Sequence, residues 1–335
     1  MQFLVTGGAG FIGSHLSQEL MKRGDSIISI DNFNDYYDVK LKESNYRCVL
    51  KSSTFYNAYY KMYRGDIRDK KLIETIFKEN TIDGVISLAA NAGVRPSIDD
   101  PLYYVDVNLM GLTNILEGMR LNNCKSIVFI SSSSVYGNNK KVPFSEKDSV
   151  DKPISPYAAT KKAGELLCYT YHSLFNINVA CLRYFTVYGP RQRPDLAINK
   201  FTKRLMNDEP IEMYGDGSTS RDYTYVSDIV NGTILALDYI CKNNKVYEIF
   251  NLGGSNPISL IELIQVISIT VGKTPKINQL PMQPGDVNIT YSDYSHAKKI
   301  LGYEPKINIR EGIQMFYNWN IENGGKNRWN LCYDV

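Results

Sequence analysis

Short apolar runs alternate with longer helical patterns through the first half of the chain. Runs of about four to eight apolar residues fit strands, and apolar positions spaced three and four residues apart fit helices. Alternation of this kind predicts βαβ units and a doubly wound parallel sheet with helices on both faces, an α/β fold. The predicted elements are, in chain order, 3–6, 12–22, 27–30, 83–89, 102–120, 126–130, 157–175 and 179–184.

A tyrosine-rich stretch, residues 36–63, interrupts the alternation. We interpret it as an inserted helix and loop before a strand that ends near Gly65 and Asp66. The insertion leaves the expected fold class unchanged, because the strands resume after it in the same rhythm.

The pattern changes after Gly189 and Pro190, where proline and glycine divide the chain into segments with short helices. This change indicates a second, smaller α/β domain, while the pattern of 227–252 returns one helix and one strand to the first. Ligands of open α/β sheets bind at the carboxyl ends of the strands. We therefore expect the active site in the cleft between the domains. The expected boundaries are 1–184 plus about 227–255 for the larger domain, and about 185–226 plus 256–335 for the smaller.

Composition and charge narrow the classes of partner. Lys plus Arg number 38 against 35 for Asp plus Glu, without a basic run, so we expect no nucleic-acid partner. No apolar stretch reaches the roughly 18 residues of a membrane helix, so we expect no membrane partner. The six cysteines are scattered without a CxxC pair, which argues against a zinc site or a disulfide framework. We expect reduced cysteines, no metal, a small-molecule partner and a cytoplasmic location.

Residues 6–13, with the sequence TGGAGFIG, follow the first predicted strand and open the first helix. Gly7 permits a tight turn, Gly10 lets the backbone approach a pyrophosphate, and Gly13 lets helix and strand pack closely. The phosphates would lie at the helix N-terminus. A purely structural turn is the alternative, but the strand, loop, helix and a later acidic residue together favour a dinucleotide site of the Rossmann type.

That acidic residue is Asp31, which ends the second predicted strand. Its carboxylate can accept a hydrogen bond from an adenosine 2′-hydroxyl but would repel the 2′-phosphate of NADP. Asn32 follows in place of Arg or Lys, so we expect NAD. Asp66 ends the third predicted strand, and two interpretations stay open for it: a contact to the adenine edge, or a helix cap before Arg68.

Tyr157 and Lys161 stand four residues apart on a predicted helix and share one face. Taken alone, such a pair is more often a solvated helix surface. Upstream, SSSSVYG at 131–137 follows a strand, at the sheet edge where a nicotinamide would lie. Together with the glycine loop, these motifs resemble the extended short-chain dehydrogenase/reductase superfamily, and the resemblance runs from Met1 to about Tyr317.

The resemblance implies a Ser-Tyr-Lys site. Tyr157 would be the acid/base, and Lys161 would bind the nicotinamide ribose and lower the pKa of the phenol. Ser132, or Ser133 in its place, would hydrogen-bond the reacting oxygen. Moving a tyrosine pKa from near 10 to about 7 takes roughly 4 kcal/mol, which a nearby Lys and the cationic nicotinamide can supply. The implied NAD-binding set is Gly7, Gly10, Phe11, Ile12, Gly13, Asp31, Asn32, Asp66, Ile67, Ala89, Ala90, Asn108, Tyr157, Lys161 and Tyr184.

Two positions narrow the implied reaction. Nucleotide-sugar dehydratases and decarboxylases of the superfamily carry Asp-Glu or Glu just before Val-Tyr-Gly, whereas this chain has Ser133 and Ser134. A serine cannot protonate a leaving group as those carboxylic acids do. Removal and return of hydride at C4 of the sugar, through a 4-keto intermediate, is the chemistry that remains. We therefore expect an NAD-dependent epimerase.

Four segments resemble parts of relatives that bind nucleotide sugars. In SRDY at 220–223 and PGDV at 284–287, Arg221 would meet the diphosphate and Asp286 the uridine ribose. AGVRPS at 92–97 and FTVYGPRQRPD at 185–195 resemble UDP-glucuronate 4-epimerases, although Asn91 replaces their usual glutamine. The implied substrate-binding set is Arg95, Ser97, Ser132, Ser133, Tyr157, Thr186, Arg193, Asn199, Arg221 and Asp286.

Two alternatives stay open. The same chemistry would act on UDP-glucose and UDP-galactose or on a UDP-N-acetylhexosamine, although those epimerases usually carry Asn where Thr186 stands. A protein of this fold could also be a non-catalytic NAD-binding sensor. The resemblance further implies a homodimer, formed by helices 102–120 and 157–175 of each subunit.

Overall fold

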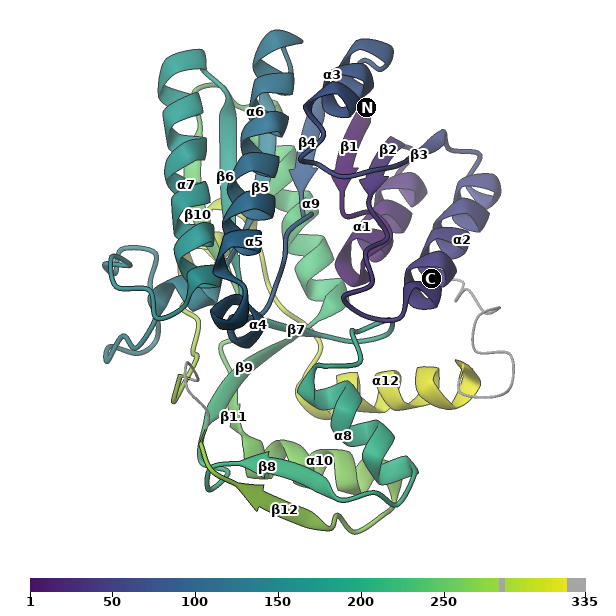
Figure 1. Cartoon of the computed structure of the whole chain (residues 1–335), viewed down its shortest axis with the longest axis vertical. Helices are drawn as coiled ribbons and strands as arrows, with labels where there is room; N and C mark the ends of the chain where they lie inside the picture. The colour runs from purple at the N-terminus through teal and green to yellow at the C-terminus, as the bar shows by residue number, and fades with distance from the viewer. Residues whose placement is uncertain (283–286, 324–335) are drawn as a thin grey trace.

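The computed structural model describes residues 1–282 and 287–323. Its centre is a seven-stranded sheet in the order β10-β6-β5-β4-β1-β2-β3 (Figure 1), and all neighbouring strands in it run parallel. The strands are β1 (Gln2–Thr6), β2 (Ser26–Asp31), β3 (Tyr60–Arg64), β4 (Gly84–Ser87), β5 (Ser126–Ser132), β6 (Asn178–Tyr184) and β10 (Tyr247–Leu252). The predicted α/β class with a parallel sheet is confirmed.

Helices cover both faces of this sheet. They are α1 (Phe11–Lys22), α2 (Val39–Phe55), α3 (Lys70–Glu79), α6 (Gly111–Leu121), α7 (Pro156–Phe175) and α9 (Val226–Lys242). In β1, Phe3 and Val5 pack into the apolar layer that includes α1 and α9, whereas Leu4 packs into the layer that includes α3, α6 and α7. Successive side chains of a strand point to opposite faces, so each buried strand contributes to two cores.

One predicted segment agrees with the structure and another differs in detail. The tyrosine-rich stretch contains the expected inserted helix, α2, and the strand that follows it, β3, begins at Tyr60 and ends at Arg64. The helix expected at 102–120 is divided into α5 (Pro101–Val105), a π-helical turn (Asp106–Met110) and α6. A π turn keeps nearly the same spacing of apolar residues as an α-helix, so the sequence pattern does not reveal it.

The second part of the chain adds two small sheets with helices. Figure 1 shows most of these elements gathered beyond one end of the large sheet, where β7 follows β6; the exception is α11, which packs against β10 and α9. They are β7 (Thr186–Tyr188), α8 (Ala197–Met206), β8 (Ile211–Tyr214), β9 (Ser220–Tyr225), β11 (Pro257–Ser259), α10 (Leu260–Val271), β12 (Ile277–Leu280), α11 (Ser295–Leu301) and α12 (Ile309–Asn323). The strand orders are β11-β9-β7 and β12-β8. The division into two domains at the expected boundaries stays a prediction.

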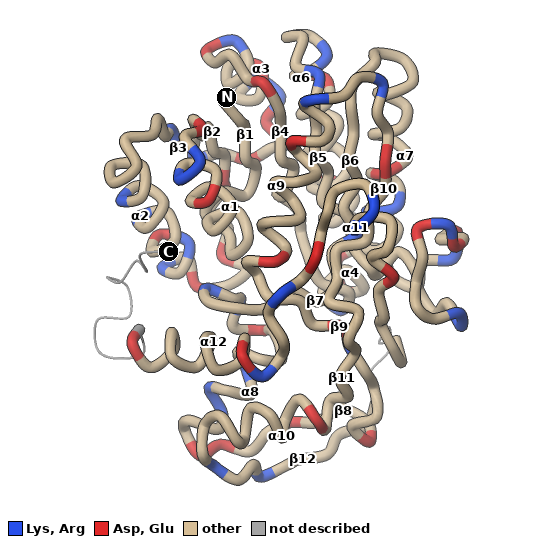
Figure 2. The backbone as a smooth tube through the Cα atoms, turned by 180° about the vertical axis from the view of Figure 1, so that it is seen from behind, with Lys and Arg blue, Asp and Glu red and all other residues tan. Residues whose placement is uncertain are grey.

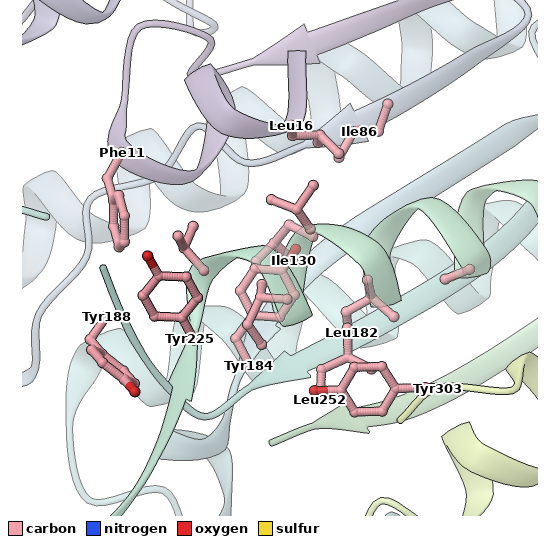
Figure 3. Close-up of a cluster of buried hydrophobic side chains, with 14 of the residues drawn as sticks. Phe11, Leu16, Ile86, Ile130, Leu182, Tyr184, Tyr188, Tyr225, Leu252 and Tyr303 are labelled. Carbon is pink, nitrogen blue, oxygen red and sulfur yellow. The ribbon is translucent and has the colours of Figure 1, made fainter. Parts of the chain in front are cut away.

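One apolar cluster extends from the large sheet into these added elements. In Figure 3, Phe11 at the start of α1 lies beside Tyr188 of β7 and Tyr225 of β9. The same cluster includes Phe3 of β1 and Leu263 of α10, both fully buried. The added elements are therefore anchored by packing to the edge of the sheet where the strands end.

The distribution of charge and the length of the helices bear on the expected partners. In Figure 2 the basic and acidic residues of the described chain are intermixed along its helices and loops. Among the described residues, no helix is both long enough and apolar enough to span a membrane.

Cys124, Cys168, Cys181 and Cys241 are free thiols, but Cys48 on α2 is disulfide-bonded, so the expectation of reduced cysteines is wrong for Cys48. Spacing along the chain does not tell which sulfur atoms meet in space.

Candidate active site

A cavity of about 410 Å³ lies at the carboxyl ends of the sheet strands. It is lined by the loop after β1, the ends of β2 and β5, the first turns of α7, and the segment that links β6 to α8. Every residue of the implied NAD-binding set lines it except Asn108. Of the implied substrate-binding set, Ser132, Ser133, Tyr157, Thr186 and Arg193 line it.

The glycine loop has the geometry of a phosphate cradle. Gly7 has φ +74°, which favours glycine, and its amide donates to the carbonyl of Ile30 over 2.8 Å. A Cβ at Gly13 would lie 2.2 Å from the carbonyl oxygen of Gly7, so a side chain there would push the loop from the helix. The N-cap residue of α1, Gly10, makes no side-chain capping bond. The first amides of α1 therefore remain available to an anion in the cavity.

Asp31 braces this loop from the end of β2. Its two carboxylate oxygens accept hydrogen bonds from the amides of Ala9 (3.1 Å) and Phe33 (2.9 Å). Burial raises the pKa of Asp31, and these two hydrogen bonds oppose the shift. Each carboxylate oxygen can accept more than one hydrogen bond, so Asp31 can also accept one from a ribose hydroxyl.

Asp66 lines the cavity next to Asn32. Its carboxylate accepts hydrogen bonds from the amide of Arg68 (2.9 Å), from the guanidinium of Arg68 (3.0 and 2.9 Å) and from Asn32 Nδ2 (3.0 Å). Partial burial opposes it, but these bonds lower the pKa of Asp66 to about 2. The N-cap of α3 is Asp69 rather than Asp66. Asp66 therefore holds the turn before that helix and remains exposed to the cavity.

Tyr157 and Lys161 lie on the first turns of α7 and line the cavity together. The helix begins there because Ser155 caps it by accepting from the amide of Ala158 (3.1 Å) and Pro156 occupies the first position. Burial raises the pKa of Tyr157, and a polar contact with Ser132 opposes the shift. Burial lowers the pKa of Lys161 to about 8.

The serines at 131–134 make different contacts. Ser131 lines the cavity, but its hydroxyl is already engaged, because it donates to the buried carboxylate of Glu165 over 2.7 Å. Ser132 ends β5, and its hydroxyl accepts from the amide of Ser134 over 3.1 Å. Ser133 also lines the cavity. Of the two serines predicted to meet the reacting oxygen, Ser132 is the one in contact with Tyr157.

Asn108 was predicted in the NAD-binding set, but it lies behind the cavity wall. Its side chain accepts from the amide of Asn91 (2.8 Å) and donates to the carbonyl of Asn91 (3.1 Å) and to Thr160 (3.0 Å). The π-helical turn that carries Asn108 thus ties the segment after β4 to α7. Asn108 positions backbone near Tyr157 in this arrangement.

Thr186 and Arg193 lie on the segment that leaves β6, and both face the cavity. The guanidinium of Arg193 donates to Asp195 through Nε (3.0 Å) and Nη2 (2.6 Å), and it lies 4.9 Å from the centre of the Tyr36 ring. Sequence reasoning did not select Tyr36 or its neighbour Tyr37, which also line the cavity. The available signal was a tyrosine-rich insertion that begins soon after Asp31.

Four of the predicted substrate contacts within the described residues do not line the cavity. Arg95 lies 5.0 Å from the centre of the Tyr214 ring, and Ser97 donates to the carbonyl of Val94 within helix α4 (Val94–Asp99). Asn199 donates to the carbonyl of Gln192, and Arg221 to that of Ser220. Asp286 lies outside the described residues. The roles of these residues stay predictions.

The chain is similar to known proteins over nearly its full length. A family model described as GDP-mannose 4,6 dehydratase matches residues 4–316. The chain is 45% identical to the UDP-glucuronate 4-epimerase of Thermodesulfobacterium geofontis over 96% of each chain. The crystal structure of the Bacillus cereus UDP-glucuronic acid 4-epimerase in complex with UDP-glucuronic acid and NAD matches with a TM-score of 0.88, 37% identity, and coverage of 96% of this chain and 99% of that one.

A relative with a different named sugar also matches. The crystal structure of the Thermotoga maritima UDP-glucose 4-epimerase with UDP-glucose has a TM-score of 0.84 at 32% identity, and the match covers 96% of this chain and 99% of that one. The matched span includes the glycine loop, the Tyr157 and Lys161 pair, and the segment that carries Thr186 and Arg193. The chain therefore belongs to the GDP-mannose 4,6 dehydratase family of extended short-chain dehydrogenases/reductases.

Proposed function

We propose that this protein is an NAD-dependent epimerase that interconverts UDP-glucuronate and UDP-galacturonate by inverting C4 of the sugar. The observation that carries the proposal is one cavity that combines three features. These are a glycine-rich phosphate cradle, the Tyr157 and Lys161 pair, and a cationic group, Arg193, on the segment that leaves β6. Relatives named for this activity cover nearly the whole chain.

The residues present fit NAD. A Cβ at Gly13 would overlap the loop backbone, so the cradle requires glycine where a pyrophosphate would approach. Asp31 supports a bond to an adenosine 2′-hydroxyl and disfavours a 2′-phosphate by charge. The residue that follows Asp31 is Asn32 rather than a lysine or arginine.

The chain supplies acid/base groups for the reaction. When bound, NAD provides a hydride acceptor at C4 and, after the keto sugar has turned, a hydride donor to its other face. Tyr157 takes the proton from the C4 hydroxyl and returns it to the new hydroxyl, a role typically worth 10²–10⁴-fold in rate. Ser132 orients the same oxygen by a hydrogen bond. Lys161 lowers the pKa of the phenol by its charge.

The side chains beside Tyr157 favour epimerisation over elimination. A dehydratase needs an acid near the leaving group, and the chain has Ser133 and Ser134 at these positions. Ser133 lines the cavity and can only donate or accept a hydrogen bond. The 4-keto intermediate therefore has no assigned group that would drive loss of water.

A glucuronate substrate brings an additional requirement. Oxidation at C4 makes a β-keto acid, which loses carbon dioxide when its carboxylate bond aligns with the carbonyl π system. Thr186 and Arg193 would hold the C6 carboxylate out of that alignment by a hydroxyl and a guanidinium. Both side chains line the cavity that contains Tyr157.

We also propose a homodimer built on the α5, α6 and α7 surface. Leu102 of α5 is 81% exposed, and Leu166, Tyr169 and Leu174 of α7 are more than half exposed. Apolar side chains grouped on neighbouring helices are typical of a protein interface. A helical interface of this kind leaves the cavity within each subunit. The two domains, with the cavity between them, remain part of the proposal.

The cytoplasm is the location we propose for the protein. Four of its cysteines are free thiols, which is common in a reducing compartment, whereas the bonded Cys48 counts against it. Fractionation of the source cells, with detection by antibody, tests the location.

A sugar panel tests the proposed activity. The purified protein is incubated separately with UDP-glucuronate, UDP-glucose and UDP-N-acetylglucosamine, and the anomeric protons of the products are followed by NMR. The proposal expects UDP-galacturonate from the first and much slower conversion of the others. Faster conversion of UDP-glucose would assign a hexose epimerase, and bound NAD with no conversion of any sugar would assign a sensor.

A further inference from the structure

Arg193 is fixed on one side by Asp195 and leaves another side open. The Asp195 carboxylate accepts hydrogen bonds from Nε and Nη2 of Arg193, and Asp195 does not line the cavity. Among the described residues, Asp195 is the one carboxylate that pairs with Arg193. The Arg193 side chain is only 17% exposed and lines the cavity. Nη1 is therefore the guanidinium nitrogen that Asp195 does not engage, and the proposal below assigns it to an incoming anion.

Tyr36 fixes the plane of that guanidinium. The guanidinium carbon lies 4.9 Å from the centre of the Tyr36 ring, a distance at which a cation is attracted to an aromatic face. Asp195 restrains rotation within the guanidinium plane, and the ring face restrains its tilt. Two restraints from different elements are needed to hold a long side chain in one orientation.

Tyr36 itself is held from the opposite side. A Cβ at Gly93 would lie 3.1 Å from the Tyr36 hydroxyl, so this hydroxyl sits against the segment after β4. It makes polar contacts with Arg193 and with Tyr104, whose own hydroxyl donates to the carbonyl of Ala92 over 3.1 Å. The Tyr104 ring packs edge to face with Tyr157 at 6.2 Å. Tyr36 is thus linked on one side to Arg193 and on the other to the residue next to the proposed acid/base.

We propose that Tyr36 is a positioning residue that gives the site its preference for a sugar with a C6 carboxylate. It does so by holding the Nη1 edge of Arg193 toward the cavity. This inference rests on the proposed function, because it assigns Arg193 to the substrate carboxylate. The loop that carries Tyr36 leaves β2 just after Asp31, so a contact to the cofactor is the competing role.

Tyr36→Leu removes the aromatic face, and Tyr36→Phe retains it. Tyr36 is 41% exposed, so neither change opens a cavity in the core. A matched control is Tyr46→Leu, since Tyr46 makes the same kind of contact with Arg64, at 5.4 Å, away from the cavity. Affinities for UDP-glucuronate and UDP-glucose are measured by calorimetry in a Tyr157→Phe background, in which turnover should be roughly 10³-fold slower.

Loss of the ring should weaken UDP-glucuronate binding roughly 3- to 30-fold, the range of cation–π contributions converted to affinity. Binding of UDP-glucose and the amount of bound NAD should stay within about twofold of the Tyr157→Phe parent. Tyr36→Phe and Tyr46→Leu should keep the preference for UDP-glucuronate. Equal weakening for both sugars, loss of NAD, or an unchanged preference in Tyr36→Leu would each overturn the role of Tyr36. A parent with no preference for UDP-glucuronate would overturn the proposed function, and the role of Tyr36 with it.

Discussion

The ammonium group of Lys161 donates a hydrogen bond to the carbonyl oxygen of Ile130 over 2.7 Å. This bond joins α7 to β5 at the wall of the cavity, and the ammonium nitrogen of Lys161 lies 5.9 Å from the centre of the Tyr157 ring. The side chain is buried, with only 4% of the residue exposed, and burial lowers its pKa from 10.5 to about 8. Burial of the Lys161 ammonium group thus destabilises the fold, at the position where the proposed reaction needs a positive charge.

Replacing Lys161 by Met should raise stability at neutral pH and abolish activity. The folded state binds this proton more weakly than the unfolded chain, so Lys161 destabilises the fold by up to about 3 kcal/mol below pH 8. The parent should gain stability as pH rises from about 8 to 10.5, and Lys161→Met should show less of this rise. Urea unfolding at pH 7 and pH 9.5 measures the gain in stability of the variant and the rise in stability of the parent with pH. A variant less stable than the parent at pH 7 would contradict this account of burial.

Tyr157→Phe should lower the epimerisation rate by roughly 10³-fold, because the phenol is the assigned acid/base and such groups contribute 10²–10⁴-fold. The ring that packs against Tyr104 is retained, so the fold and the bound NAD should be unaffected. Turnover by NMR and the absorbance of released cofactor provide the two readouts. A rate within tenfold of the parent would remove Tyr157 from that role.

The purified protein should carry NAD or NADH, and added NADP should not displace it. Asp31 is buried and already accepts two backbone amides, so it cannot move aside for a 2′-phosphate. Extraction of the cofactor followed by mass spectrometry identifies the species. Recovery of NADP as the main bound form would show that Asp31 has another function.

Glu165→Gln should destabilise the protein by about 3–5 kcal/mol, the usual cost of leaving one partner of a buried ion pair uncompensated. Glu165 and Arg183 are 0% and 1% exposed, and Glu165 also accepts from Ser131. Glu304→Gln is the matched control, since Glu304 pairs with Lys298 at 2.8 Å on the exposed surface. The control should change stability by less than about 1 kcal/mol. Similar changes for both variants in urea unfolding would contradict the importance of burial.

Arg193→Ala and Thr186→Ala should impair UDP-glucuronate turnover far more than any residual UDP-glucose turnover. Both side chains are assigned to the C6 carboxylate, which glucose lacks. With the carboxylate less restrained, some intermediate should lose carbon dioxide and leave a UDP-4-keto-pentose, which mass spectrometry detects. Equal losses on both sugars would place the carboxylate site elsewhere, with Arg95 and Ser97 as the next candidates.

The parallel sheet and the cofactor side of the cavity could be predicted from the sequence because they depend on local signals. Strands buried on both faces are continuous apolar runs, and the glycine loop needs glycine at Gly7 for its φ and at Gly13 for its packing. Features that depend on distant contacts could not be predicted this way. The π-helical turn around Asn108 keeps a helical apolar spacing, and Tyr36 reaches Arg193 only through the folding of an insertion.

The substrate side was predicted less completely. Motif resemblance selected Arg95 and Ser97, which lie near each other in sequence, yet one packs on Tyr214 and the other bonds within its own helix. Whether Arg95 turns toward a substrate depends on side-chain orientation, which segment similarity does not encode. Cys48 shows the same limit, since its bonding depends on three-dimensional proximity.

Transfer of hydride from C4 and back to C4 within one site is the central claim, and an isotope experiment tests it most directly. UDP-glucuronate carrying deuterium at C4 is incubated with the protein in ordinary water, and the UDP-galacturonate formed is analysed by NMR and mass spectrometry. The account predicts a product that retains the deuterium at C4, because the hydride leaves and returns without exchange with solvent. A product with hydrogen from water at C4, or recovery of unchanged substrate, would contradict it.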